Sequence, residues 1–140
     1  MSNFVNTIDL LGDEVVCASI IDRSITELKD DTVSKVDRYV FYGCKNLTKV
    51  EFLSYVEFDE SSFNECSNLT VLILRSEIMC KLKNVTAFFG TPIRNGEGYI
   101  YVPSSLVSSY QSRWSSEKFR ALEDYTVDGT TTGELDPTKI

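Results

Sequence analysis

One stretch of this chain contains the same sequence pattern twice, 22 residues apart. The segment Phe41–Phe52 reads FYGCKNLTKVEF, and the segment Phe63–Leu74 reads FNECSNLTVLIL, with phenylalanine, cysteine, asparagine and leucine at matched positions. A fixed period of this length is typical of solenoids, in which each repeat packs only against its neighbours. The pattern therefore predicts an α+β repeat solenoid. It implies little about chemistry, because repeats build surfaces more often than catalytic sites.

The repeat continues in weaker form on both sides of this stretch. Upstream, Ile25–Leu28 aligns with Leu47–Val50, and Asp30 falls where Phe52 stands in the next copy. Downstream, a third corner at Ala87–Gly90 lacks the cysteine, and a further strand is expected within Gly98–Ser105. Each repeat is thus predicted to contain a short strand, a second extended piece and a corner. The repeat region is predicted to span residues 25–107.

Both ends of the repeat region carry predicted helical caps, because an uncovered solenoid end exposes apolar surface. At the N-terminus, Asp13 is a helix-capping residue that precedes several apolar positions, and residues 1–24 are interpreted as a lid; the alternative is a partner-binding helix. After the repeats, Ser104 or Ser105 can cap a helix containing Tyr110 and Trp114, and residues 108–125 are predicted to form the second cap. Residues 126–140 have little to bury and are expected to be a flexible tail or a partner-dependent strand.

The repeat resembles a known family. Its pattern is VxxVxxxVFYGCxxLxxVxF over residues 33–52, and it is similar to the BspA-type, or Treponema-type, leucine-rich repeat. Val40 and Ser62 replace the usual alanine of that pattern, and Leu53 replaces the usual proline. The resemblance implies a short leucine-rich-repeat β-solenoid with one strand per repeat lining one face. The opening residues 11–27 and the closing residues 98–107 with 119–123 also resemble segments of leucine-rich-repeat proteins encoded by phages and prophages of gut Firmicutes, which implies a virion or tail protein.

Charge and composition exclude several classes of partner. The formal net charge of −7 argues against nucleic acid, which needs clustered lysine and arginine. No stretch approaches the ~18 apolar residues of a membrane helix, and no secretory signal is recognised, so neither a membrane nor a secretion route is expected. The chain is expected in a bacterial host cytoplasm or in an assembled virion.

Catalytic and metal chemistry are not expected. The chain has no histidine, which removes the usual base of a serine or cysteine nucleophile. Its four cysteines, Cys17, Cys44, Cys66 and Cys80, form no CxxC pair, so neither a zinc site nor another cofactor is predicted. Cys44 and Cys66 share one repeat position and are expected to be reduced core residues. A disulfide between them is the less favoured alternative.

The residues that alternate outward on the strands form the candidate binding surface. This column begins with the charged residues Glu27 and Lys29. It continues through the candidate binding residues, which are Lys49, Glu51, Val71, Ile73, Tyr99 and Tyr101. Tyrosine offers rigid amphipathic contact area, so an exposed patch here is a predicted partner site. The alternative is that Trp114 or the C-terminal helix folds back and covers it.

These observations predict a non-enzymatic protein-binding or structural module that presents a repeat surface to a protein or a surface glycan. A phage tail, virion or host-interaction role is the leading interpretation. The alternative is a small phage inhibitor of a host defence enzyme, for which one coherent acidic face is the expected mark. Association of copies into a homo-oligomer through solenoid ends or edge strands is a third prediction.

Overall fold

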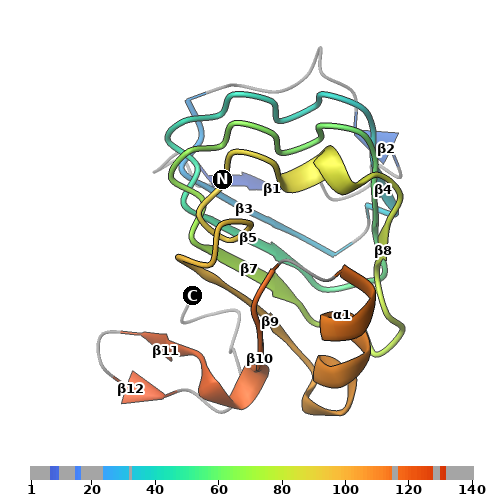
Figure 1. Ribbon diagram of the computed structural model, residues 1–140. Helices are drawn as coiled ribbons and strands as arrows, with labels where there is room; N and C mark the ends of the chain where they lie inside the picture. Colours follow the sequence, from blue (N-terminus) through green and yellow to red (C-terminus); the bar gives the residue numbers. More distant parts are fainter. Residues whose placement is uncertain are drawn as a thin grey trace.

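The computed structural model describes residues 7–9, 15–16, 24–31, 33–114, 117–127 and 130–131 of the 140, with side chains over 24–31, 33–114 and 117–125. Parallel strands stack along a solenoid axis in two sheets (Figure 1). The larger sheet has the order β1-β3-β5-β7-β9-β10, and the smaller has the order β2-β4-β6-β8. The repeat solenoid predicted from the sequence is confirmed.

The strands are short, as the repeat length requires. The larger sheet contains β1 (Thr7–Asp9), β3 (Glu27–Asp30), β5 (Lys49–Phe52), β7 (Val71–Leu74), β9 (Tyr99–Val102) and β10 (Phe119–Ala121). The smaller sheet contains β2 (Val15–Val16), β4 (Lys35–Val36), β6 (Glu57–Phe58) and β8 (Lys81–Leu82). A separate antiparallel pair joins β11 (Thr126–Val127) to β12 (Thr130–Thr131), within the segment predicted to be a tail.

The 22-residue period sets the strand register. Lys49 lies opposite Val71 and Phe52 opposite Leu74, so equivalent residues of successive repeats are neighbours in space. The third repeat is longer, and β7 pairs with β9 so that Val71 lies opposite Tyr99. This connection needs a glycine, because a Cβ at Gly98 would lie 2.4 Å from the carbonyl oxygen of Thr70.

The corners form a third hydrogen-bonded stack. The Phe41 N–H donates to the Ser62 carbonyl at 2.8 Å, and the Phe63 N–H donates to the Ala87 carbonyl at the same distance. Each corner uses left-handed backbone, which Gly43 adopts at φ +72° and its equivalent Glu65 at φ +64°. The third corner is a 3-10 helix, η2 (Val85–Phe88), which begins after the capping residue Asn84.

The core is a ladder of stacked apolar side chains between the sheets and the corners. Phe41 stacks on Phe63 at 4.9 Å between ring centroids, and Phe63 stacks on Phe88 at 5.3 Å. Cys44 and Cys66 are buried and form no disulfide, as predicted, and the Cys66 thiol donates to the Phe41 carbonyl. The repeated Phe-x-x-Cys pattern therefore records packing between successive turns.

The N-terminal helix predicted within residues 1–24 is wrong at Val15–Val16. These residues form β2, which pairs in parallel with β4, and Thr7–Asp9 form β1, which pairs with β3. The described N-terminal residues thus extend both sheets by one strand, because paired backbone covers an open sheet edge. The other residues of this predicted cap, apart from Ser24, lie outside the described part of the chain.

The segment predicted to form the C-terminal cap contains one short helix and one strand. A 3-10 turn, η3 (Ser104–Leu106), leads into α1 (Val107–Trp114), where the sequence predicts a helix. Tyr110 and Trp114 are buried and pack with Phe119 against the last repeat. Phe119 belongs to β10, so the apolar pattern after the helix continues as a strand and then as the 3-10 turn η4 (Leu122–Asp124).

Candidate functional site

The six candidate binding residues lie on one face of the larger sheet, which we call the strand face. The register aligns Lys49, Val71 and Tyr99 in one row, and Glu51, Ile73 and Tyr101 in the next. The intervening row points into the core and consists of Leu28, Val50, Leu72 and Ile100, all nearly inaccessible to solvent. The predicted alternation of the strands is therefore confirmed.

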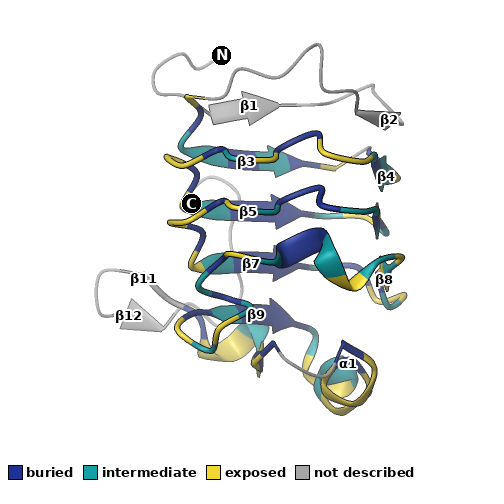
Figure 2. Ribbon diagram, turned by 45° about the horizontal axis from the view of Figure 1, so that its top comes forward, coloured by how far each residue is buried: buried dark blue, intermediate teal, exposed yellow. Residues whose placement is uncertain are grey.

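The two rows differ in exposure. Lys49, Val71 and Tyr99 are half-buried, and we call this row the open half of the strand face. The other row is the covered half, where Glu51 is 1% exposed, Ile73 0% and Tyr101 9%. Figure 2 shows this change along β5, β7 and β9, which begin with an intermediate residue and end buried. The prediction that the full column is an exposed patch is wrong for the covered half.

The cover comes from the residues that follow β10. Tyr125 is 7% exposed and packs edge-to-face against Tyr101 with 5.1 Å between ring centroids. Leu122 packs beside it, and together with Ile73 they form an apolar cluster separate from the main core. We call residues Leu122–Tyr125 the cover segment. Its position explains the difference in exposure, since Ile73 and Tyr101 are buried in this cluster, whereas Val71 and Tyr99 pack only at its edge and stay partly exposed.

Neither Trp114 nor α1 forms this cover, although the sequence pointed to them. Trp114 packs on the core side against Phe58 at 5.9 Å and Phe88 at 6.0 Å between ring centroids. The spacing of Leu122 and Tyr125 was the available signal, because apolar residues three positions apart lie on one side of a 3-10 turn. The alternative that the patch is covered is therefore correct for the second row, but the covering residues are Leu122 and Tyr125 instead of Trp114 or the helix.

A buried ion pair lies beside the apolar cluster. The Arg75 Nε donates to Glu51 Oε2 at 2.6 Å, where Glu51 is almost fully buried and the Arg75 side chain is 20% exposed. Arg75 was not among the site residues predicted from the sequence. Its signal was an arginine directly after β7, at the position equivalent to Leu53 in the previous repeat. The pair fixes the polar end of the covered half.

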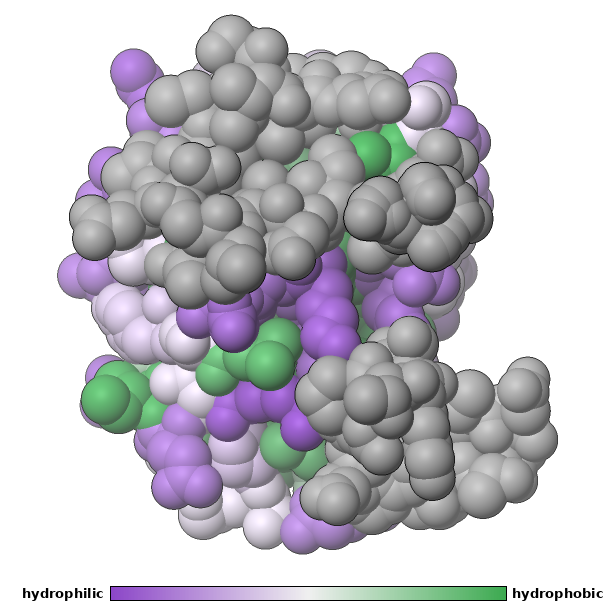
Figure 3. Space-filling view, turned by 180° about the vertical axis from the view of Figure 1, so that it is seen from behind, coloured by the Kyte–Doolittle hydropathy of each residue, from purple (hydrophilic) through white to green (hydrophobic). Residues whose placement is uncertain are grey.

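The open half combines charge with an aromatic ring. The Arg120 guanidinium lies over the ring of Tyr99, 5.0 Å from its centroid, and holds that ring at the end of the row. Lys49 lies opposite Val71 on one side and Glu27 on the other. Seen from behind, the molecule shows polar and apolar side chains intermixed (Figure 3). With a cation, an aliphatic side chain and an aromatic ring, Lys49, Val71 and Tyr99 give the open half a small mixed contact surface.

Burial also sets the protonation of the groups near this site. Burial raises the pKa of Tyr101 and of Tyr125 above the usual tyrosine value, so both phenols stay neutral at physiological pH. Away from the strand face, directly before β8 of the smaller sheet, burial likewise raises the pKa of the Cys80 thiol, which disfavours the reactive thiolate. Within the described ranges, no group of histidine, cysteine or carboxylate side chains is arranged to hold a metal ion.

No helix among the described residues has the length and apolarity needed to cross a membrane. A family model described as "BspA type Leucine rich repeat region" matches residues 17–114 in six copies. No curated protein and no solved structure matches the chain.

Proposed function

Because the chain belongs to the BspA-type leucine-rich repeat family, we propose that it is a non-enzymatic module that binds a protein partner on the open half of its strand face. Family membership supports a protein-interaction role in general. The particular surface rests on one observation, the alignment of Lys49, Val71 and Tyr99 in a single partly accessible row. A cation, an aliphatic side chain and a tyrosine together suit the mixed chemistry of protein interfaces.

The cover segment sets the limits of this surface. A rigid partner reaches Lys49, Val71 and Tyr99, whereas contact with Ile73 or Tyr101 requires displacement of Leu122 and Tyr125. Lys49 and its neighbour Glu27 give one end of the row its polarity. The other end is apolar and aromatic. We therefore expect a partner surface with a carboxylate at one end and an apolar contact at the other.

Site-specific photo-crosslinking tests this proposal. A photoreactive residue placed at Lys49 on β5 is expected to capture a protein from an extract of the source cells. The matched control is Lys35 on β4, which has intermediate exposure and also begins a short strand, but lies on the other sheet. Equal capture at both positions, or capture at Lys35 alone, would overturn the assignment of the surface. Recovery of glycan in place of protein would overturn the assignment of the partner class.

Alanine substitution separates binding from folding on the same strand. Tyr99→Ala removes a half-buried ring at the edge of the cluster and is expected to reduce crosslinking from Lys49 with a smaller loss of thermal stability than Tyr101→Ala. Tyr101→Ala removes a ring that packs against Tyr125, so it is expected to lower stability first. A loss of stability in Tyr99→Ala with no loss of capture would assign that ring to packing.

The biological setting we propose is a phage- or prophage-encoded protein, attached to a tail or virion or directed at the host surface. The support is the resemblance of the opening and closing segments to phage-encoded repeat proteins. On this proposal the chain resides in a bacterial cytoplasm or an assembled particle. Mass spectrometry of purified particles tests it, because a virion component is present there in defined copy number. Absence from particles and from any neighbourhood of tail genes would contradict it.

The alternative of an acidic inhibitor of a host enzyme has weaker support. Such a protein needs one coherent acidic face, whereas the described columns alternate in sign. Glu27 lies opposite Lys49, and Lys29 lies opposite Glu51 on the larger sheet. On the smaller sheet Glu57 lies between Lys35 and Lys81. This interleaving favours a binding module over a mimic of nucleic acid.

A further inference from the structure

The smaller sheet ends at a strand with an open edge. Among the described residues β8 pairs only with β6, through Lys81 N–H to the Val56 carbonyl and Lys83 N–H to the Phe58 carbonyl. Backbone groups of successive residues in a parallel ladder point to opposite sides, so the N–H and C=O of Leu82 point away from β6. Beyond this edge the chain forms α1 rather than another strand.

One backbone group of this edge is already satisfied by a side chain. The Cys80 N–H, two residues before Leu82 and on the same side of the strand, donates to the Tyr110 hydroxyl of α1 at 2.7 Å. Tyr110 is fully buried, and its hydroxyl accepts the hydrogen bond that a further strand would otherwise accept at this position. The replacement stops there, because no hydrogen bond from the Leu82 N–H to another described residue is present. The edge is therefore half closed.

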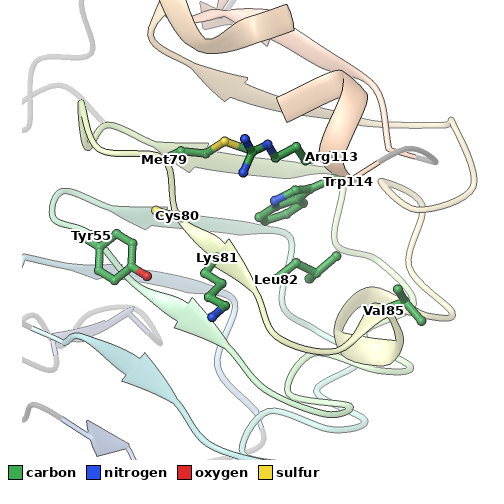
Figure 4. A pocket seen from close by; sticks show the side chains of 8 residues that line it. All are labelled: Tyr55, Met79, Cys80, Lys81, Leu82, Val85, Arg113 and Trp114. Atoms are coloured by element: carbon green, nitrogen blue, oxygen red, sulfur yellow. The ribbon is translucent and has the colours of Figure 1, made fainter. Parts of the chain in front are cut away.

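A groove of about 410 Å³ lies along the unfilled part, between β8 and the end of α1. Its apolar lining comes from Met79, Leu82, Val85 and Trp114, and its cations are Lys81 and Arg113 (Figure 4). Val85 lines this groove and is 62% exposed, so its side chain is accessible to an apolar group of a ligand. The groove thus combines an unpaired strand edge with apolar walls.

The two cations give the groove a charge opposite to that of the whole chain. Lys81 and Arg113 are exposed, and in the described part of the chain neither forms an ion pair. The nearest carboxylate along the column is Glu57, which accepts a hydrogen bond from the Tyr55 hydroxyl at 2.8 Å. On a chain of net charge −7, a cationic groove without a lining carboxylate fits an anionic group of a ligand.

We propose that this groove binds an extended peptide segment of another protein, with an aspartate or glutamate next to an apolar residue, by adding that segment as a strand to β8. The ligand backbone pairs with Leu82, which continues the ladder that the fold leaves open. Its apolar side chain contacts Leu82 and Trp114, and its carboxylate contacts Arg113 and Lys81. This surface lies on the smaller sheet and is separate from the strand face, so the two proposals stand or fall independently.

The first test is an NMR titration with a defined probe, the blocked pentapeptide acetyl-Val-Glu-Val-Glu-Val-amide. The expected result is a saturable shift of the Leu82 amide and the Trp114 indole signals, with added protection of the Leu82 amide from exchange. The control peptide acetyl-Val-Lys-Val-Lys-Val-amide has the same strand propensity and the opposite charge. Its affinity is expected to be lower by about fivefold or more, because it lacks the carboxylates that contact the exposed Arg113 and Lys81.

Charge reversal on the protein separates the groove from general electrostatics. Arg113→Glu and Lys81→Glu are each expected to weaken the glutamate peptide about fivefold or more. Lys83→Glu is the matched control, because it makes the same charge change two residues along the chain and does not line the groove. It is expected to change affinity less than about twofold. All three side chains are exposed, so the variants should keep the fold.

Three results would overturn the proposal. The first is absence of binding, or equal binding of both peptides. The second is that the peptide shifts NMR signals of strand-face residues only. The third is a concentration-dependent dimer that protects the Leu82 amide and excludes the peptide, which would assign this edge to a second copy of the chain.

Discussion

Replacement of Phe63 by alanine is expected to cause one of the largest losses of stability available in this chain. The ring is inaccessible to solvent and lies at the centre of the Phe41–Phe63–Phe88 stack, with a further edge contact to Phe58. Burial of a phenylalanine side chain and the cavity left by its removal together cost about 3–5 kcal/mol. Each lost aromatic pair adds about 0.5–1.5 kcal/mol beyond area, so we expect the upper half of that range, about 4–5 kcal/mol.

Equilibrium unfolding in urea measures this loss through the single tryptophan. Trp114 lies against Phe58 and Phe88 at the end of the same core, so its fluorescence reports the relevant transition. Tyr42→Ala is the control, since it removes a ring that is 44% exposed from the neighbouring corner, and a change of about 0.5 kcal/mol or less is expected. A loss of less than about 2 kcal/mol for Phe63→Ala would show that the corner phenylalanines are not the main ladder of the core.

Three further predictions concern charge, backbone strain and pH. Arg75→Met leaves the buried Glu51 carboxylate without its cation and should cost about 2–4 kcal/mol in urea unfolding; adding Glu51→Leu should recover most of that loss, and a double variant no more stable than the single one contradicts it. Glu65→Gly relieves a left-handed backbone conformation at φ +64° and should raise stability by about 0.5–1 kcal/mol, whereas Glu65→Ala, which keeps the strain, should not. Burial, with the Glu57 carboxylate second, raises the pKa of Tyr55 to about 12 from 10.0; because the folded pKa is the higher one, the stability from this group is complete below pH 10 and is lost as pH rises from 10 to 12. Tyr55→Phe should therefore flatten the fall of the urea midpoint in that window, and an unchanged slope contradicts it.

The repeat carried most of the information needed to derive the fold. Equivalent residues 22 apart become register partners, so the matched Phe41 and Phe63 or Val50 and Leu72 could be placed side by side from the sequence alone. Each repeat packs against the repeat before it and the repeat after it, so a wrong placement of a strand in one repeat would disagree with its equivalents in the next. The ends lack this constraint. Val15–Val16 has the apolar content of a helix, and only the open edge of β4 favours a strand there.

The candidate site was predictable in its geometry and only partly in its exposure. Alternation along the strands placed Lys49, Val71 and Tyr99 on the same face as Glu51 and Ile73. Covering of one row depends on Leu122 and Tyr125, which stand outside the repeat and have no aligned copy to show where they pack. A single short turn with two apolar residues is too weak a sequence pattern to predict a long-range contact.

Leu122–Tyr125 divides the strand face into an open and a covered half, and thiol labelling of single cysteines on β7 is the decisive test of this division. Val71→Cys and Ile73→Cys lie two residues apart on the same face, in a Cys17→Ser background where Cys44, Cys66 and Cys80 are buried. The cysteine at 71 is expected to react about tenfold faster or more than the cysteine at 73, because reagent reaches the latter only when the cover segment opens. Adding Tyr125→Ala should bring the two rates together. Similar labelling rates at positions 71 and 73 in variants that keep Tyr125 would contradict the division of the face.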